Sequence, residues 1–198
     1  MAYWRVAGNA GGPDPDPPDP LPGRLSAAER ALLERRMVLL TGPVDHARAA
    51  AVAASLMALE ALGDDPVELR MSAGSDSLDV AFALMDTIDS LGVAVNGTVA
   101  GTVGGTMVGV LAVCRHRRIG ALGHIHLHEP RAEFTGVASE LHHQATDMQQ
   151  RVESFVRRLA EVTGRPFEHV EADLRSGLHL DAAGAVAYGL ADQIVGRT

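Results

Sequence analysis

The chain has 198 residues, 46% of them hydrophobic, and a formal net charge of -8 at pH 7. This length suits one domain with a substantial core. The negative charge argues against a nucleic-acid partner, which would need a basic surface to bind. The single cysteine, Cys114, excludes a disulfide framework within the chain and favours a reducing compartment. Because the N-terminal residues also lack the basic start and apolar core of a secretory signal, we expect a cytoplasmic protein.

The first residues differ in composition from the rest. Residues 1–23 contain PDPDPPDPLP, which can form neither a helix nor the interior of a sheet, so we predict a disordered tail. The domain is then expected over residues 24–198. It opens with the capping-box residues Ser26 and Glu29, which predict a helix to about Arg36. Residues 37–40 follow as a buried strand.

Strands and helices alternate over the next part of the chain. Asp45 can cap an alanine-rich helix that ends at Gly63, and a strand over residues 67–71 follows. After a polar turn at residues 72–76, Ser77 opens another helix with apolar residues on one face. This alternation predicts an α/β fold made of parallel crossover units.

The stretch from Leu91 to Pro130 is the centre of the sequence. We predict an apolar strand, a glycine-rich turn, a small-residue helix ending near Cys114, and a short strand that carries His128. A strand–turn–helix often presents a nucleophile at a helix N-terminus, but this turn contains no serine or cysteine. The apolar run is long enough to span a bilayer. Its asparagine, threonines and many glycines favour a buried strand and a close-packed helix instead, with no membrane partner.

The C-terminal third is mainly helical. A helix over residues 137–163 has an apolar stripe and is longer than a compact domain of this size needs. We therefore expect it to project and pack against another subunit. Shorter helices begin at Pro166 and Asp181, and residues 190–195 end the fold as a strand or turn.

Histidines are the most obvious candidates for chemistry. His124, His126 and His128 alternate along one strand, a spacing that can bind zinc, but no carboxylate or cysteine completes such a site. We therefore predict no metal and no cofactor. His128, at a strand end, is a plausible general base. Five hydroxyl residues could be proposed as nucleophiles, although cap and turn roles explain the serines better: Ser72, Ser75, Ser77, Thr102 and Thr106.

Several phrases of the sequence occur in the order that one enzyme family shows. They are RALLERRMVLLTGPV, ALMDTIDSL, IHLHEP, EVTGRPFEHVEAD and AVAYGLADQIV, and they extend from about Leu25 to Gly196. Over this span the chain resembles the ClpP family, the proteolytic subunit of the ATP-dependent Clp protease. The resemblance implies a ClpP/crotonase-like α/β fold of repeated ββα units with a protruding handle helix. It also implies heptameric rings, two of which pair through the handles as a tetradecamer.

The same resemblance indicates which catalytic groups are present. The family uses a Ser-His-Asp triad, and His128 matches its histidine. Counting without gaps places Val103 at the serine position and Gly177 at the aspartate position. The oxyanion-hole positions are matched by Asp76 and Gly104. The Pro/Asp-rich tail also replaces the family's axial loops, which engage a hexameric ATPase.

These replacements would remove the chemistry of the family. Valine has no atom that attacks a carbonyl, Gly177 cannot orient the imidazole, and Asp76 would place negative charge beside an oxyanion. We therefore predict a catalytically silent subunit of a Clp-type assembly. Its partners would be copies of itself, an active ClpP paralogue, or both, and in addition a hexameric Clp ATPase. Two alternatives stay open: an active ATP-dependent serine-type endopeptidase whose nucleophile is misaligned, and a crotonase-like acyl-thioester enzyme with Asp76 as its acid.

Overall fold

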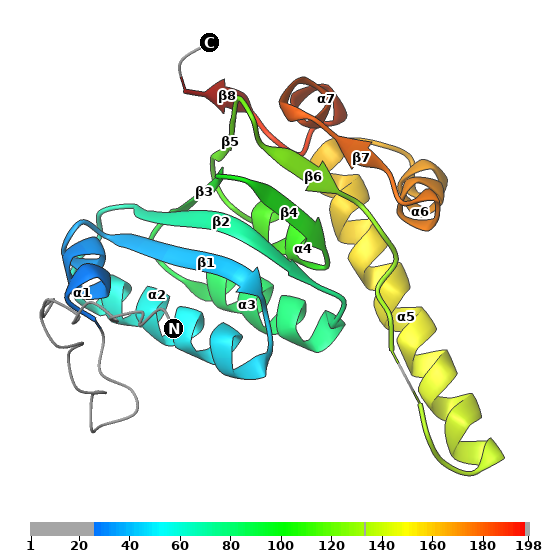
Figure 1. The fold of residues 1–198 in the computed structure, drawn as a ribbon. Coiled ribbons are helices and arrows are strands. Elements are labelled where there is room, and N and C mark those ends of the chain that lie inside the picture. Colours follow the sequence, from blue (N-terminus) through cyan, green and yellow to red (C-terminus); the bar gives the residue numbers. More distant parts are fainter. Residues whose placement is uncertain (1–25, 133, 197–198) are drawn as a thin grey trace, which may run out of the picture.

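The computed structural model describes residues 26–132 and 134–196, so the tail predicted for residues 1–23 lies outside the described residues. In this described part, eight strands form one sheet in the order β7-β6-β4-β2-β3-β5-β8, with β1 paired to β2 (Figure 1). Only the β6–β7 pair is antiparallel. The strands are β1 (Met37–Pro43), β2 (Val67–Ser75), β3 (Val95–Val99), β4 (Thr102–Gly105), β5 (Arg117–Gly120), β6 (His124–His126), β7 (His179–Leu180) and β8 (Gln193–Val195).

Helices cover one side of this sheet and extend beyond it. The helices α2 and α3 lie side by side beneath the strands, and α5 projects from the body as a long handle (Figure 1). The α6 and α7 helices lie near the C-terminal end of α5. The bounds are α1 (Ala27–Glu34), α2 (His46–Ala61), α3 (Leu78–Ser90), α4 (Met107–Ala112), α5 (Ala138–Thr163), α6 (Phe167–Ser176) and α7 (Ala182–Tyr188).

Capping side chains fix several helix starts as the sequence predicted. The Ser26 hydroxyl accepts from the Glu29 backbone N–H at 3.1 Å, and the Glu29 carboxylate accepts from the Ser26 N–H at 2.9 Å. Asp45 caps α2, Ser77 caps α3 and Asp181 caps α7 by accepting a backbone N–H three residues on. Each cap satisfies an N–H that would otherwise lack a partner at the start of its helix.

The prediction of a polar turn at residues 72–76 was wrong for most of that segment, because β2 continues to Ser75. Its first half pairs with β3 over Val67–Met71, and its end pairs with β4 at Gly74 and Ser75. The chain leaves the sheet after β3 and returns as β4, so that β3 and β4 both lie beside β2. The glycine-rich segment is therefore partly a strand rather than a turn, and α4 begins directly after it.

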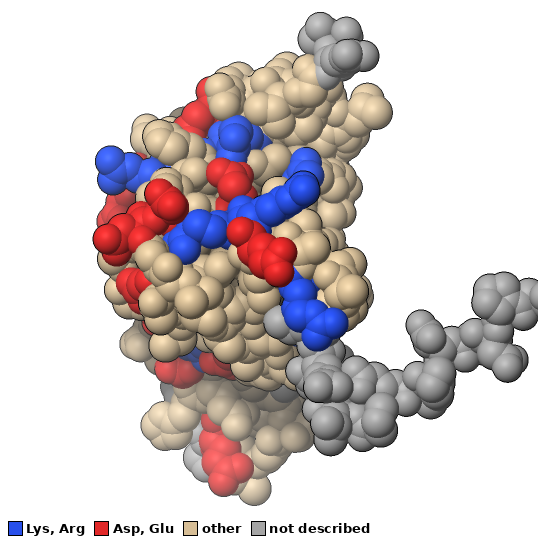
Figure 2. Space-filling model, turned by 90° about the vertical axis from the view of Figure 1, so that its left-hand side faces the viewer, with Lys and Arg blue, Asp and Glu red and all other residues tan. Residues whose placement is uncertain are grey.

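The β5 strand was not predicted from the sequence. Its residues are too polar for an apolar strand pattern, but they pair with β3 on one side and β8 on the other. Arg117 pairs with Asp192 at 2.5 Å, and Arg118 forms an ion pair with Glu68 of β2. Figure 2 shows that basic and acidic side chains are also interspersed on the face of the molecule drawn there. The strand is thus held by distant partners that a local pattern does not reveal.

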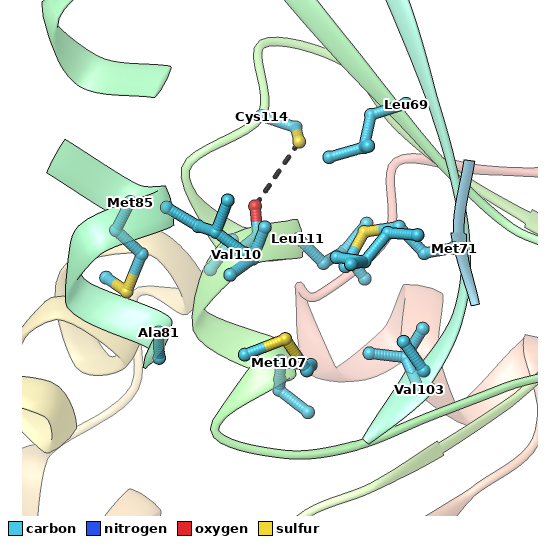
Figure 3. Close-up of a cluster of buried hydrophobic side chains, with 14 of the residues drawn as sticks. Leu69, Met71, Ala81, Met85, Val103, Met107, Val110, Leu111 and Cys114 are labelled. Carbon is cyan, nitrogen blue, oxygen red and sulfur yellow. Dashed lines mark hydrogen bonds between the residues drawn. The ribbon is translucent and has the colours of Figure 1, made fainter. Parts of the chain in front are cut away.

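The core lies mainly between the sheet and the α2, α3 and α4 helices. Figure 3 shows Leu69, Met71 and Val103 beside Met107 and other α4 residues in one apolar cluster. All of the α4 residues are buried. No helix of the described residues is both long enough and apolar enough to cross a bilayer. The apolar run that suggested a span folds as two strands and this short helix.

Cys114 is part of this cluster. Its thiol donates to the Val110 carbonyl at 3.3 Å, the dashed contact in Figure 3. Burial raises the pKa of the Cys114 thiol to about 12. Because the thiolate is the reactive form, Cys114 is an inert core residue rather than a nucleophile.

The handle helix is attached to the core through a contact that requires glycine. A Cβ added at Gly109 would lie 2.5 Å from Phe155 Cε2 and 2.8 Å from Met85 Sδ. We expect Gly109→Ala to lower the free energy of unfolding, because a clash cost of roughly 1–3 kcal/mol outweighs the helix-propensity gain of about 1 kcal/mol. Chemical denaturation measures this change. The control is Gly120→Ala, whose Cβ would meet nothing closer than 3.5 Å; an equal effect of both variants would contradict the expectation.

Candidate active site

A cleft opens where the carboxyl ends of parallel strands meet, the edge at which α/β sheets usually bind ligands. Its volume is about 690 Å³. Small residues and backbone form most of its walls, and one acidic side chain and two histidines lie among them. The lining residues are Gly42, Pro43, Val44, Ser72, Ala73, Gly74, Ser75, Asp76, Thr102, Gly104, His126 and His128.

His128 lies just beyond β6, as the sequence predicted. Its Nδ1 atom lies 3.2 Å from the Glu129 carbonyl oxygen and 3.4 Å from Asp76 Oδ1. Both neighbours are acceptors, which favours a proton on Nδ1 and leaves the Nε2 lone pair free. These two contacts therefore favour the tautomer that a general base needs.

The residue that faces Nε2 is Gly105, at the end of β4. A Cβ built at this position would lie 2.8 Å from His128 Nε2. The same Cβ would lie only 2.2 Å from the Ser75 carbonyl oxygen, and the φ of Gly105 is +60°. The backbone of β2 thus fills the space that a nucleophilic side chain would need.

Val103, which gap-free counting places at the serine position, does not face His128. It pairs with Ile125 of β6, is fully buried, and lies in the apolar cluster of Figure 3. It is absent from the lining of the cleft. The two residues after Val103 are the ones beside the histidine: an added Cβ would lie 4.0 Å from His128 Nε2 at Gly104 and 2.8 Å from it at Gly105.

The Ser75 carbonyl also takes the backbone N–H that follows Gly105. It accepts from the Thr106 N–H at 2.8 Å and lies 3.0 Å from the Thr106 hydroxyl. An oxyanion hole needs free backbone N–H groups directed at the developing charge. The N–H at the start of α4 is already taken, and Gly104, at the other predicted oxyanion position, lines the cleft as part of a paired strand.

Two of the hydroxyl groups near the histidine, those of Ser75 and Thr106, have other partners. Thr106 is fully buried, and its hydroxyl is within hydrogen-bond distance of the Ser75 and Ser77 carbonyls. The Ser75 hydroxyl accepts from the Ser77 N–H. Within residues 26–132 and 134–196, no serine or threonine hydroxyl forms a hydrogen bond with His128.

Asp76 lies beside His128, and Gly177 lies beside His126. Asp76 follows β2, and its carboxylate lies within ion-pair distance of Nδ1 of His128, a contact that the sequence did not predict. Gly177 caps α6 in a left-handed conformation with a φ of +72°, and a Cβ there would lie 3.8 Å from His126 Nε2. A second hollow of about 570 Å³ lies between the two residues and also borders His126 and His128. The position predicted for the aspartate is therefore beside the site, but it carries no side chain.

The three histidines predicted to share one side of a strand are not equivalent. His124 is exposed and contacts the Leu122 carbonyl, whereas the rings of His126 and His128 lie 4.8 Å apart. His179 of β7, which the sequence did not single out, stacks on His126. Across the described residues, no group of three or more potential ligand side chains could hold a metal ion.

These features define an α/β protein with a projecting handle helix and a histidine cleft at the carboxyl ends of its strands. A family model described as Clp protease matches residues 24–198, so the chain belongs to the Clp protease family. Among solved structures, a mutant of ClpP1 from Listeria monocytogenes is similar to it, with 20% sequence identity and a TM-score of 0.77. The match covers 85% of this chain and 95% of that one. The ClpP-like α/β fold expected from the resemblance is confirmed.

Proposed function

We propose that this chain is a catalytically silent subunit of a Clp-type protease assembly in the cytoplasm. Its role is structural or regulatory, within heptameric rings that pair as tetradecamers. The rings contain copies of this chain, an active ClpP paralogue, or both, and a hexameric Clp ATPase is a further partner. No cofactor takes part.

One observation carries the proposal: Gly105 and Gly104, at which an added Cβ would lie 2.8 Å and 4.0 Å from Nε2 of His128, have no side chain. We assign Gly105, rather than Val103, to the position of the family's serine. The Ser75 carbonyl blocks a larger residue there and also takes the Thr106 N–H that an oxyanion would need. Nucleophile and oxyanion hole are thus removed by the same backbone segment.

The proposed assembly role is supported by the handle. The N-terminal part of α5 extends away from the body, while its C-terminal part is anchored by buried Phe155, Val156 and Leu159 (Figure 1). A helix that leaves the core of its own subunit presents its surface to another. In the Clp protease family this is the element expected to join two rings.

The experiment combines an activity measurement with native mass spectrometry. The purified chain is incubated with a short fluorogenic peptide, with an active ClpP paralogue from the same cell as the positive control. We expect no turnover by the chain alone, and oligomers containing this chain, alone or with the paralogue. Peptide turnover that co-purifies with this chain would instead support the alternative of an active endopeptidase whose nucleophile is misaligned. A monomer that binds acyl-CoA would support the acyl-thioester enzyme.

A further inference from the structure

Three imidazole rings lie close together at the cleft: His126 on β6, His128 just beyond β6, and His179 on β7. The rings of His126 and His179 are stacked, with centroids 3.7 Å apart and planes 12° from parallel. The His128 ring follows at 4.8 Å from His126. Stacked neutral rings attract, but two imidazolium ions at this separation would repel strongly.

The stack joins a very short strand to the sheet. Strand β7 has two residues and pairs only with β6, in the register Ile125↔Leu180 and His126↔His179. One further backbone bond runs from the Leu127 N–H to the Leu178 carbonyl at 2.8 Å. Gly177, which lines the second hollow, lies between this attachment and the end of α6, where its N–H donates to the Leu174 carbonyl.

Few charged groups are placed to stabilise a proton on the stacked pair. In the described chain, no carboxylate lies within ion-pair distance of His126 or His179, and the nearby Asp76 is directed at His128. Arg175 of α6 and Glu129, which follows β6, border the hollow and form an ion pair with each other.

The other charged groups on neighbouring elements have separate partners or contribute positive charge. Asp181 caps α7, and Asp173 of α6 accepts from the Tyr188 hydroxyl of α7. Arg131 lines the same hollow and adds positive charge, and His124 on β6 is exposed. The β4 strand contributes no titratable group. A positive charge on the stacked rings would therefore find little negative charge on the neighbouring elements to balance it.

We propose that the His126–His179 stack is an acid-sensitive latch, which holds β7 on the sheet at neutral pH and releases it when both rings are charged. Release would free the segment that follows Gly177 and open the hollow beside His128. The latch is independent of the proposed catalytic silence, because neither ring needs to take part in chemistry.

The direction of the pH dependence follows from His126. Burial, then the charges of His179 and His128, lower the pKa of His126. The unfolded or detached segment therefore takes up a proton at higher pH than the latched one. The stabilisation is complete above the pKa of a free histidine, about 6.5, and is lost as the pH falls below it.

Hydrogen exchange of the full chain between pH 7.5 and 5.0 tests the latch, after correction for intrinsic exchange. We expect the protection of the Leu127 N–H to fall by about tenfold on acidification, the size of a like-charge repulsion. The Val99 N–H in the central sheet should keep its protection. In His179→Phe, which retains an aromatic ring but cannot charge, the acid effect at Leu127 should disappear. The matched control, His124→Gln, should retain it.

Two outcomes would overturn the proposal. One is unchanged protection of the Leu127 N–H at pH 5.0 in the unmodified chain. The other is an acid effect that persists in His179→Phe. If His179→Phe does not fold, His126→Phe provides the same comparison from the other ring. A direct NMR titration shows whether the pKa of His126 is lower than that of free histidine.

Discussion

Replacing Gly105 by serine is expected to create no peptidase and to destabilise the protein. The new Cβ would need to lie 2.2 Å from the Ser75 carbonyl, at a φ of +60° that side chains rarely adopt. Strain of about 1–3 kcal/mol and overpacking of about 1–3 kcal/mol together predict a loss of roughly 2–6 kcal/mol in the free energy of unfolding. Chemical denaturation and a fluorogenic peptide assay measure the two effects.

The matched control for this variant is Gly105→Ala, which adds the same Cβ without a hydroxyl. The two variants should lose similar stability, and neither should hydrolyse the peptide. Turnover that appears in Gly105→Ser but not in Gly105→Ala would show that β2 moves aside to form a working site. It would contradict the interpretation that the Ser75 carbonyl closes the site.

Replacing Phe155 by alanine is expected to destabilise the fold strongly. Its side chain is fully buried where α5 meets α4, and it packs against the backbone at Gly109 and near the Phe82 ring. Truncating a buried phenylalanine costs about 3–5 kcal/mol, because the transfer free energy is lost and a cavity remains. The midpoint of chemical denaturation measures the loss.

The control is Phe134→Ala, because Phe134 is 40% exposed and its loss leaves no cavity in the core. Its effect should be small, within about 1 kcal/mol. Equal effects of the two variants would mean that α5 is not anchored through Phe155. If the handle joins two rings as proposed, Phe155→Ala should also shift native mass spectra from paired toward single rings.

The sequence predicted most of the fold because its signals are local. Ser26, Asp45, Ser77 and Asp181 precede helices at capping positions, and each accepts the expected backbone N–H. The limits of β2 and the existence of β5 could not be read in this way. Both depend on pairing with strands that are distant in sequence, so a polar segment such as Arg117–Gly120 becomes a strand only through its neighbours.

The candidate site was partly predicted. His128 was found because it precedes a proline at a strand end in a recognisable phrase. The residue facing it was not, because gap-free counting carries no information on which way a side chain points. Val103 and Gly105 are two residues apart, yet one lies in the core and the other faces the imidazole. The contact of Asp76 with His128 likewise depends on β2 extending to Ser75.

Labelling of the purified chain with a fluorophosphonate probe, followed by intact-mass spectrometry and peptide mapping, tests the proposed silence of the site most directly. The probe reacts with hydroxyl nucleophiles activated by a neighbouring base. We predict that the chain keeps its unmodified mass while an active ClpP paralogue in the same tube is labelled. One adduct per chain on a serine or threonine near His128 would contradict the proposal.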